Sequence, residues 1–265
     1  MTEMKLRMTL AAAAVAAFAG LAGTAQAAQC GNTAAGFEAW KQQFAAEARG
    51  RASPQSLQAL MSTSYSTPTI SVDRGQHSFK LGLSEFMARR GAPTIVSRGK
   101  ALKRQYAGMF SQIQASYGVP PGPLLAIWGM ETGFGAVKGN VNTLSAVATL
   151  AYDCRRSAYF TEQLYAALQL VDRGILTPST RGAAHGEVGH TQFLPKNVVQ
   201  YGVGGDMNNV SVALQSTANF LRAHGWRPGA GYQPGEANFA AFQGWNSAGV
   251  YQQALAIMGR QIDGE

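Results

Sequence analysis

Glu131 is the acidic residue whose surroundings in the sequence point most clearly to chemistry. It ends an almost wholly apolar run that begins at Leu124. A carboxyl group held against apolar surface is costly to ionise, so its pKa rises and it can remain protonated near neutral pH. Such a group can act as a general acid on a glycosidic oxygen. The alternative is a structural glutamate at the end of a helix, whose carboxylate accepts a hydrogen bond from a local backbone N–H or pairs with an arginine.

Two other motifs have the right residue types but the wrong spacing. His185 and His190 are five residues apart in a glycine-rich stretch, whereas a zinc protease helix needs histidines four apart. The segment 244–249 misses the spacing of a nucleophile elbow by one residue. We therefore expect no metal site and no serine nucleophile there.

Helices must position Glu131, because helical periodicity dominates the chain and no alternating strand pattern or internal repeat is present. Ser53 followed by Pro54 is a typical helix start. We predict an extended, exposed loop at 62–82 and a glycine-rich loop at 181–189. Helices are predicted at 37–48, 55–61, 95–117, 124–131, 144–152, 160–171, 210–221 and 248–260. The fold class is therefore all-α.

Residues 1–27 have the pattern of a signal peptide. Lys5 and Arg7 precede an apolar run that is shorter than the roughly 20 residues of a membrane span, and Ala25-Gln26-Ala27 fits a cleavage site. The alternative is a retained anchor helix. We expect an exported protein, periplasmic or fully secreted, with no stable membrane insertion after cleavage. Residues 28–265 then form one domain, as one body or as two lobes around a groove.

Composition adds two expectations about the exported chain. Cys30 and Cys154 are its two cysteines, and an oxidising compartment favours a disulfide between them, the alternative being two separate buried thiols. The formal net charge is +8, with lysine and arginine scattered along the chain. In an exported protein this charge favours an anionic wall or membrane surface as partner, not nucleic acid.

Several segments resemble one family in the same order along the chain. Residues 129–135 (GMETGFG) resemble the catalytic Glu-Thr-x-x-Gly segment of lytic murein transglycosylases of the membrane-bound B type. Further similar blocks lie at 144–152, 155–156, 186–195, 218–226 and 245–247. The resemblance implies a lysozyme-like catalytic domain with additional helices, acting on the glycan strands of peptidoglycan without a cofactor.

The resemblance also implies a mechanism with a single carboxylate, Glu131. The family cleaves the β-1,4 bond between N-acetylmuramic acid and N-acetylglucosamine and leaves 1,6-anhydro-muramic acid ends. Glu131 would protonate the leaving oxygen and then accept the proton of the sugar's own 6-hydroxyl, with help from the muramyl N-acetyl group. Substrate groups thus replace the second carboxylate of ordinary glycosidases.

Substrate-binding positions carry over from the same blocks. They are Arg155, Arg156, Gln192, Phe193, Asn246 and Tyr251. The arginines could instead pair with Asp153 or Glu162. Phe193 could belong to the core, and Asn246 could be structural. The chain departs from the family at 201–209, which lacks the spaced acidic ligands of a calcium loop, so we expect no bound calcium. Ala183 and His185 also differ from the family pattern, which affects contacts along the groove.

Two other functions keep peptidoglycan as the ligand. A hydrolytic muramidase would need a positioned water and a second carboxylate, for which Glu187 is the nearest candidate. A non-catalytic wall-binding protein would hold the glycan without cutting it. The buried setting expected for Glu131 argues against this last function. Protein partners cannot be read from the sequence.

Overall fold

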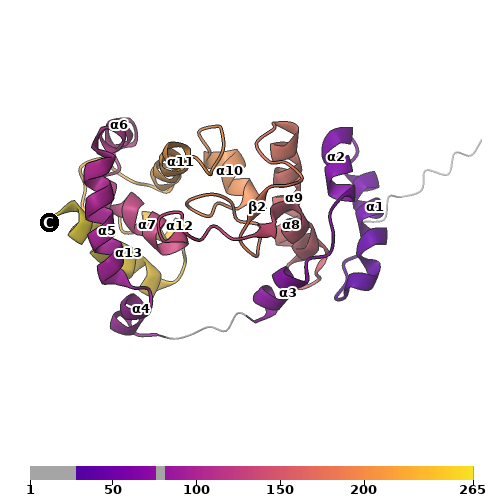
Figure 1. The fold of residues 1–265 in the computed structure, drawn as a ribbon, viewed down its shortest axis with the longest axis horizontal. Helices are drawn as coiled ribbons and strands as arrows, with labels where there is room; N and C mark the ends of the chain where they lie inside the picture. The colour runs from indigo at the N-terminus through magenta and orange to yellow at the C-terminus, as the bar shows by residue number, and fades with distance from the viewer. Residues whose placement is uncertain (1–27, 76–80, 265) are drawn as a thin grey trace, which may run out of the picture.

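The computed structural model describes residues 28–75 and 81–264, which form a helical protein with one short strand pair. Figure 1 shows α5, α7 and α13 gathered at one end of the molecule and α1 and α2 at the other. The helices are α1 (Phe37–Glu47), α2 (Pro54–Met61), α3 (Thr67–Arg74), α4 (Leu83–Arg89), α5 (Ala92–Gln105), α6 (Ala107–Tyr117), α7 (Pro121–Thr132), α8 (Thr143–Tyr152), α9 (Ser157–Asp172), α10 (Pro195–Tyr201), α11 (Val210–Ala223), α12 (Ala241–Trp245) and α13 (Gly249–Asp263), after a 3-10 turn at Ala34–Gly36. The all-α expectation is confirmed.

Helix α7 is the centre of the first group of helices. Every residue from Pro121 to Met130 is buried, and the helix packs against α5 and α13. Gly129 is needed for this packing, because a Cβ there would lie 2.5 Å from Cγ2 of Ile95 on α5. A helix that is apolar on all sides is stable only inside a protein, where neighbours cover every face. The sequence run before Glu131 is thus explained by complete burial.

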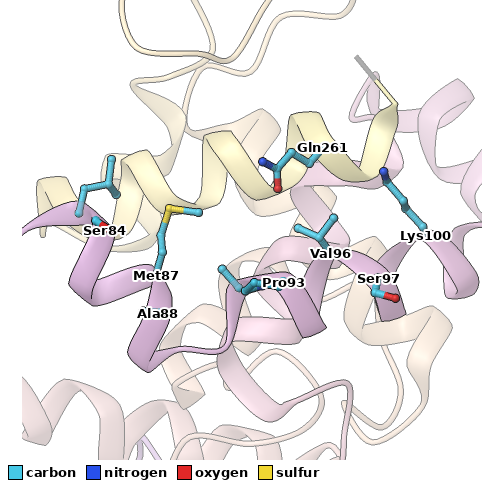
Figure 2. Close-up of a pocket in the computed structure, with 10 residues that line it drawn as sticks. Ser84, Met87, Ala88, Pro93, Val96, Ser97, Lys100 and Gln261 are labelled. Carbon is cyan, nitrogen blue, oxygen red and sulfur yellow. The ribbon is translucent and has the colours of Figure 1, made fainter.

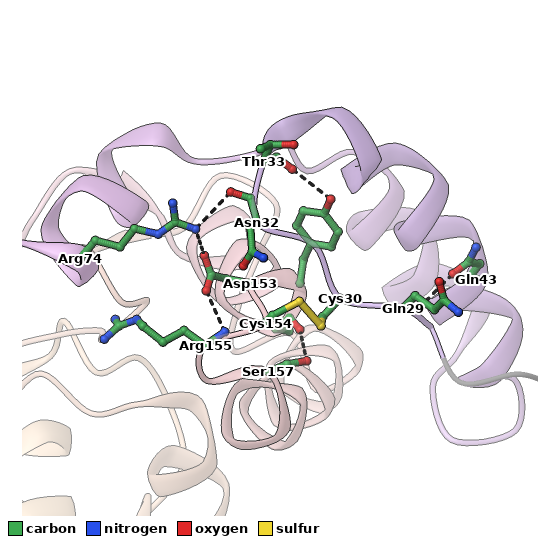
Figure 3. Close-up of a disulfide and its surroundings, with 12 residues drawn as sticks. Gln29, Cys30, Asn32, Thr33, Gln43, Arg74, Asp153, Cys154, Arg155 and Ser157 are labelled. Carbon is green, nitrogen blue, oxygen red and sulfur yellow. Dashed lines mark hydrogen bonds and ion pairs between the residues drawn. A yellow bond between two sulfur atoms is a disulfide. The ribbon is translucent and has the colours of Figure 1, made fainter.

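The second group is built on α8 and α9, with α1, α2 and α3 packed around them. The predicted disulfide between Cys30 and Cys154 is confirmed, with Cα atoms 4.9 Å apart. Figure 3 shows it joining the segment before α1 to the turn between α8 and α9. Beside it, the Gly31 N–H donates to the carbonyl oxygen of Tyr152 at 3.0 Å. The N-terminal segment is therefore fixed to the α8–α9 pair.

Buried Lys41 joins α1 to α2. Its side chain is 1% exposed, and its amine donates to the carbonyl oxygens of Met61 at 3.0 Å and Thr63 at 2.5 Å. The last carbonyls of a helix have no partner within the helix and carry partial negative charge. Lys41 satisfies such groups at the end of α2, and Glu38 lies 3.1 Å from the same amine.

The two strands are short and antiparallel. Strand β1 (Val141–Asn142) pairs with β2 (Arg181–Gly182), with Val141 opposite Gly182. Gly182 cannot carry a side chain, because a Cβ would lie 2.0 Å from the carbonyl oxygen of Glu187. The strand pair therefore fixes the start of the loop 183–189.

The predicted loop at 62–82 is wrong for residues 67–74, which form α3. Ser66 caps this helix by accepting from the N–H of Thr69, and a proline lies in its first turn. Ile70 and Asp73 on its inner face are buried. The Ser-Thr-Pro sequence is a typical helix start, although the same residue types are common in loops.

The predicted helix at 95–117 is divided into α5 and α6 at Tyr106, and α4, α10 and α12 are additional short helices.

The predicted signal peptide, residues 1–27, lies outside the described residues. Within the described ranges, none of the helices combines the length and the apolar character that crossing a bilayer requires.

Candidate active site

The side chain of Glu131 lines a polar cavity of about 440 Å³, which lies between the two groups of helices. A cavity of this size is suited to a small ligand or to a few units of a polymer. The lining side chains come from α7, α9, α10, α11, α12 and the loop that leads to α10: Glu131, Tyr159, Glu187, Gln192, Phe193, Leu194, Asn197, Tyr201, Phe220, His224, Gly244, Trp245 and Asn246. Among these residues only Glu131 and Glu187 are acidic.

Two aromatic side chains hold the Glu131 carboxyl group. The hydroxyl of Tyr251 donates to its Oε1 atom at 2.5 Å, and the indole N–H of Trp245 donates to the same atom at 3.0 Å. Both donors therefore bind the same oxygen of the carboxyl group. Tyr251 comes from α13 and Trp245 from α12, so residues more than a hundred positions apart in the chain build this contact.

Burial is the main reason that the pKa of Glu131 is raised above its ordinary value. The hydrogen bonds from Tyr251 and Trp245 and the charge of Arg90 oppose the rise, while the charge of Glu187 adds to it. The pKa of Tyr251 is itself well above 10, because the phenol is buried beside Glu131. Tyr251 therefore remains a hydrogen-bond donor at any physiological pH.

The end of α7 presents Glu131 at the cavity through a tight turn. Gly133 is left-handed with φ 56°, and the N–H of Phe134 reaches back to the carbonyl oxygen of Trp128 at 3.2 Å. The Thr132 hydroxyl donates to the carbonyl oxygen of His190 at 2.7 Å. The helix therefore stops one residue after Glu131, with the backbone turned away from the carboxyl group.

His190 joins this turn to the segment before α11 that contains Asn208. The indole N–H of Trp128 donates to its Nδ1 at 3.0 Å, and its Nε2 lies 3.0 Å from the carbonyl oxygen of Asn208. Because Nδ1 accepts a hydrogen bond, the proton of the neutral ring is on Nε2. Burial lowers the pKa of His190, which favours this neutral form. No functional role was expected for His190 from the sequence.

Gln192 and Phe193 both border the cavity, but their contacts are largely internal. The Gln192 amide donates to the carbonyl oxygen of Gly189 at 2.8 Å, and its backbone is left-handed with φ 54°. The Phe193 ring is 1% exposed and packs against Trp245. This packing favours the core alternative for Phe193, where the ring supports a residue that holds Glu131.

Asn246 lies at the cavity and also shapes the start of α13. Its side-chain oxygen accepts from the N–H of Ala248 at 2.9 Å, and its carbonyl oxygen accepts from the amide of Gln252 at 2.8 Å. These contacts support the structural alternative for Asn246, and substrate binding there stays a prediction.

Arg155 and Arg156 are not among the residues lining the cavity. Both guanidinium groups contact the carboxylate of Asp73 on α3, which is 1% exposed. Arg156 also lies over the ring of Phe160 at 4.8 Å. The arginines pair with an acidic residue, as in the alternative given above, although the partner is neither of the neighbours Asp153 and Glu162. Direct substrate binding by the two arginines stays a prediction.

The two histidines of the rejected zinc motif have separate partners. His185 lies between Glu187 and Asp73, whereas His190 contacts Trp128 and Asn208. Across residues 28–75 and 81–264, no three His, Cys, Asp or Glu side chains gather where they could hold a metal ion. The expectation of no bound calcium stays a prediction.

A larger hollow of about 910 Å³ lies between α4, α5 and α13. Figure 2 shows Met87 and Val96 pointing toward α13 across it. Its lining is mainly aliphatic, and none of the lining residues is acidic or aromatic. Its lining therefore lacks the carboxyl group that glycoside cleavage needs, and the smaller cavity at Glu131 is the candidate active site.

Known proteins resemble this chain in both sequence and fold. The family model described as the transglycosylase SLT domain matches residues 36–235. The membrane-bound lytic murein transglycosylase B of Escherichia coli (strain K12) is 34% identical over 146 residues. That alignment covers 52% of this chain and 40% of the E. coli protein, so the match spans well under half of that relative.

Solved structures with the same fold include two bacterial proteins. SltB3 from Pseudomonas aeruginosa, in complex with NAG-anhNAM-pentapeptide, superposes with a TM-score of 0.79 at 25% identity, over 86% of this chain and 80% of that one. The Escherichia coli lytic transglycosylase Slt35, in complex with bulgecin A, gives a TM-score of 0.75 at 22% identity, over 89% and 96% of the two chains.

Proposed function

Because this chain belongs to the transglycosylase SLT domain family, we propose that it is a peptidoglycan lytic transglycosylase whose acid and base is Glu131. The observation that carries the proposal is the partly buried carboxyl group of Glu131, held by Tyr251 and Trp245 at a polar cavity. Burial raises the pKa of Glu131, which favours the protonated form that a general acid needs.

In the first step, the proton on Glu131 passes to the glycosidic oxygen between N-acetylmuramic acid and N-acetylglucosamine. The carboxylate that forms accepts hydrogen bonds from Tyr251 and Trp245, which stabilise its charge. In the second step, Glu131 accepts the proton of the muramyl 6-hydroxyl as that oxygen bonds to the anomeric carbon. The ring closes to 1,6-anhydro-muramic acid, and Glu131 is protonated again.

The substrate assignment draws support from the relatives. SltB3 was solved with NAG-NAM-pentapeptide and with NAG-anhNAM-pentapeptide, which are peptidoglycan fragments. We extend this ligand class to the present cavity, with Gln192 and Asn246 on its walls and without a cofactor. Tyr251 is not among the lining residues and acts through its hydrogen bond to Glu131. The disulfide Cys30–Cys154 favours an oxidising compartment, and we propose export to the periplasm after removal of residues 1–27.

Product analysis tests the proposal directly. Peptidoglycan is incubated with the purified protein, and the released muropeptides are measured by mass spectrometry. We expect products ending in 1,6-anhydro-muramic acid, lighter by one water than hydrolytic products. Glu131→Gln should abolish their release, while Glu162→Gln on the exposed face of α9 serves as the matched control.

Other results would replace the proposal. Reducing ends as the main product would identify a muramidase. Binding to the wall without release of muropeptides would identify a non-catalytic protein.

A further inference from the structure

Glu187 is the second acidic side chain of the cavity that contains Glu131. Its side chain is 22% exposed, so the carboxylate is partly covered and still reachable from the cavity. The mechanism proposed above uses one carboxylate and gives Glu187 no role. Its place in the same cavity as Glu131 requires a separate explanation.

His185 fixes the Glu187 carboxylate in place. The backbone N–H of His185 donates to Oε2 of Glu187 at 3.0 Å, and the ring Nδ1 lies 3.3 Å from Oε1. The other ring nitrogen, Nε2, lies 3.4 Å from Oδ1 of Asp73. Asp73 is in turn held by Arg155 and Arg156. A series of contacts therefore runs from α3 and the α8–α9 turn to the cavity wall and ends at Glu187.

The backbone of the loop supports the same orientation. The N–H of Ala183 donates to the carbonyl oxygen of Glu187 at 2.9 Å. Gly186 has φ 89°, and a Cβ there would lie 2.3 Å from Cγ2 of Val147 on α8. The loop therefore lies close against α8, and this close approach directs the next residue, Glu187, toward the cavity.

The negative charge of Glu187 acts across the cavity. It adds to the effect of burial in raising the pKa of Glu131 on the opposite side. It also adds to the burial that raises the pKa of Tyr159. A fixed charge in a partly enclosed site interacts more strongly with a developing charge than the same group in water.

We propose that Glu187 is a second catalytic carboxylate, whose negative charge stabilises the positive charge that develops at the anomeric carbon. This inference rests on the proposed function. The C1–O4 bond breaks, its electron pair stays on O4, and O4 takes the proton of Glu131. The 6-hydroxyl oxygen then bonds to C1 and gives its proton to Glu131. Glu187 neither gains nor loses a proton. His185 and Asp73 are positioning residues that act through it.

The isosteric variant Glu187→Gln removes the charge and keeps the shape. With a soluble NAG-NAM oligosaccharide, we expect kcat to fall about 100-fold, the scale found when one stabilising group is removed from an active site, with KM changed less than about twofold. The products should still end in 1,6-anhydro-muramic acid. Glu187→Asp, which keeps the charge, should retain more of the kcat than Glu187→Gln.

The pH profile gives a readout that a purely structural role would not produce. The groups that face Glu131 are Tyr251 on α13, Trp245 on α12, Arg90 after α4 and Glu187 on the loop. Loss of the Glu187 charge lowers the pKa of Glu131, so the protonated acid is lost at a lower pH. The alkaline limb of the kcat profile should therefore move to lower pH in Glu187→Gln and stay in place in the control Glu162→Gln.

Three results would overturn the inference. These are an unchanged kcat in a folded Glu187→Gln protein, equal kcat values for the Gln and Asp variants, and reducing ends in the wild type that disappear in Glu187→Gln. The last result would make Glu187 the base for an attacking water. Failure of the proposed function looks different, because wild-type protein would then release no anhydro products or Glu131→Gln would remain active.

Discussion

The carboxylate of Asp263, the last residue of α13, caps the first turn of α7. Its Oδ1 accepts the N–H of Gly122 at 2.8 Å, and its Oδ2 accepts the hydroxyl of Tyr232 at 2.8 Å. Pro120, the N-cap residue of α7, has no side chain that can make this bond. The helix that carries Glu131 is thus completed by a residue 141 positions away from Gly122 in the sequence.

Asp263→Ala should lower the free energy of unfolding by about 1–3 kcal/mol, because α7 loses its cap and Tyr232 loses its acceptor. Chemical denaturation measures the change. Glu162→Gln, whose partner Lys196 is exposed and 3.6 Å away, should change stability by less than about 1 kcal/mol. Equal stability of the Asp263 variant and the wild type would show that the cap is unimportant.

Tyr251→Phe tests the short hydrogen bond to Glu131. The ring keeps its packing, but the carboxylate formed after proton transfer loses a donor. We expect kcat to fall about tenfold, on the scale of a hydrogen bond to a charged group. Because this bond lowers the pKa of Glu131, its removal raises that pKa, and the alkaline limb of the kcat profile should move to higher pH. A shift toward lower pH would contradict this role.

Glu131→Gln should make the protein more stable at neutral pH while abolishing activity. The folded-state pKa of Glu131 is raised by burial, so its ionisation opposes folding. The stability of the wild type is then complete below the pKa of an unfolded glutamate, about 4.3, and declines as pH rises through the folded pKa. Melting temperatures should therefore differ at pH 8 and converge near pH 4. A Gln variant that is less stable at both pH values would refute this.

Removal of the disulfide should lower the free energy of unfolding by about 2–5 kcal/mol, since the bridge closes a sequence separation of 124 residues. Cys30→Ser with Cys154→Ser gives the measurement by chemical denaturation, with the oxidised wild type as reference. The cavity at Glu131 is lined by other residues, so kcat of the folded variant should stay within about twofold of the wild type. A large loss of kcat without unfolding would link the bridge to the site.

The sequence predicted the features that depend on local pattern. The apolar run before Glu131 predicted a buried helix, and α7 has that character. The stripe at 160–171 predicted α9, and the paired cysteines predicted the disulfide. In each case a periodicity or a residue count reports directly on burial or on chemistry.

Features that depend on the path of the chain could not be predicted in this way. Arg155 and Arg156 contact Asp73, which lies in a segment assigned to a loop, so their partner could not be identified from neighbours in sequence. His190 and Arg90 act near Glu131 through contacts between distant segments. The pairing of Asp263 with Gly122 is of the same kind. Only the fold brings such residues together, and the type of a single residue does not indicate its partner in a distant segment.

The complete burial of α7 affects the order in which the protein can fold during synthesis. The helix is covered by α5, which precedes it in the chain, and by α13, which is synthesised well after it. Until α13 has been synthesised, the apolar face of α7 that α13 covers has no partner in the chain, and exposed surface of this kind is prone to aggregation. Tyr251, which holds Glu131, also lies on α13. A chain that has not yet reached α13 therefore lacks Tyr251, and the hydrogen bond from Tyr251 to Glu131 forms only when α13 packs against α7.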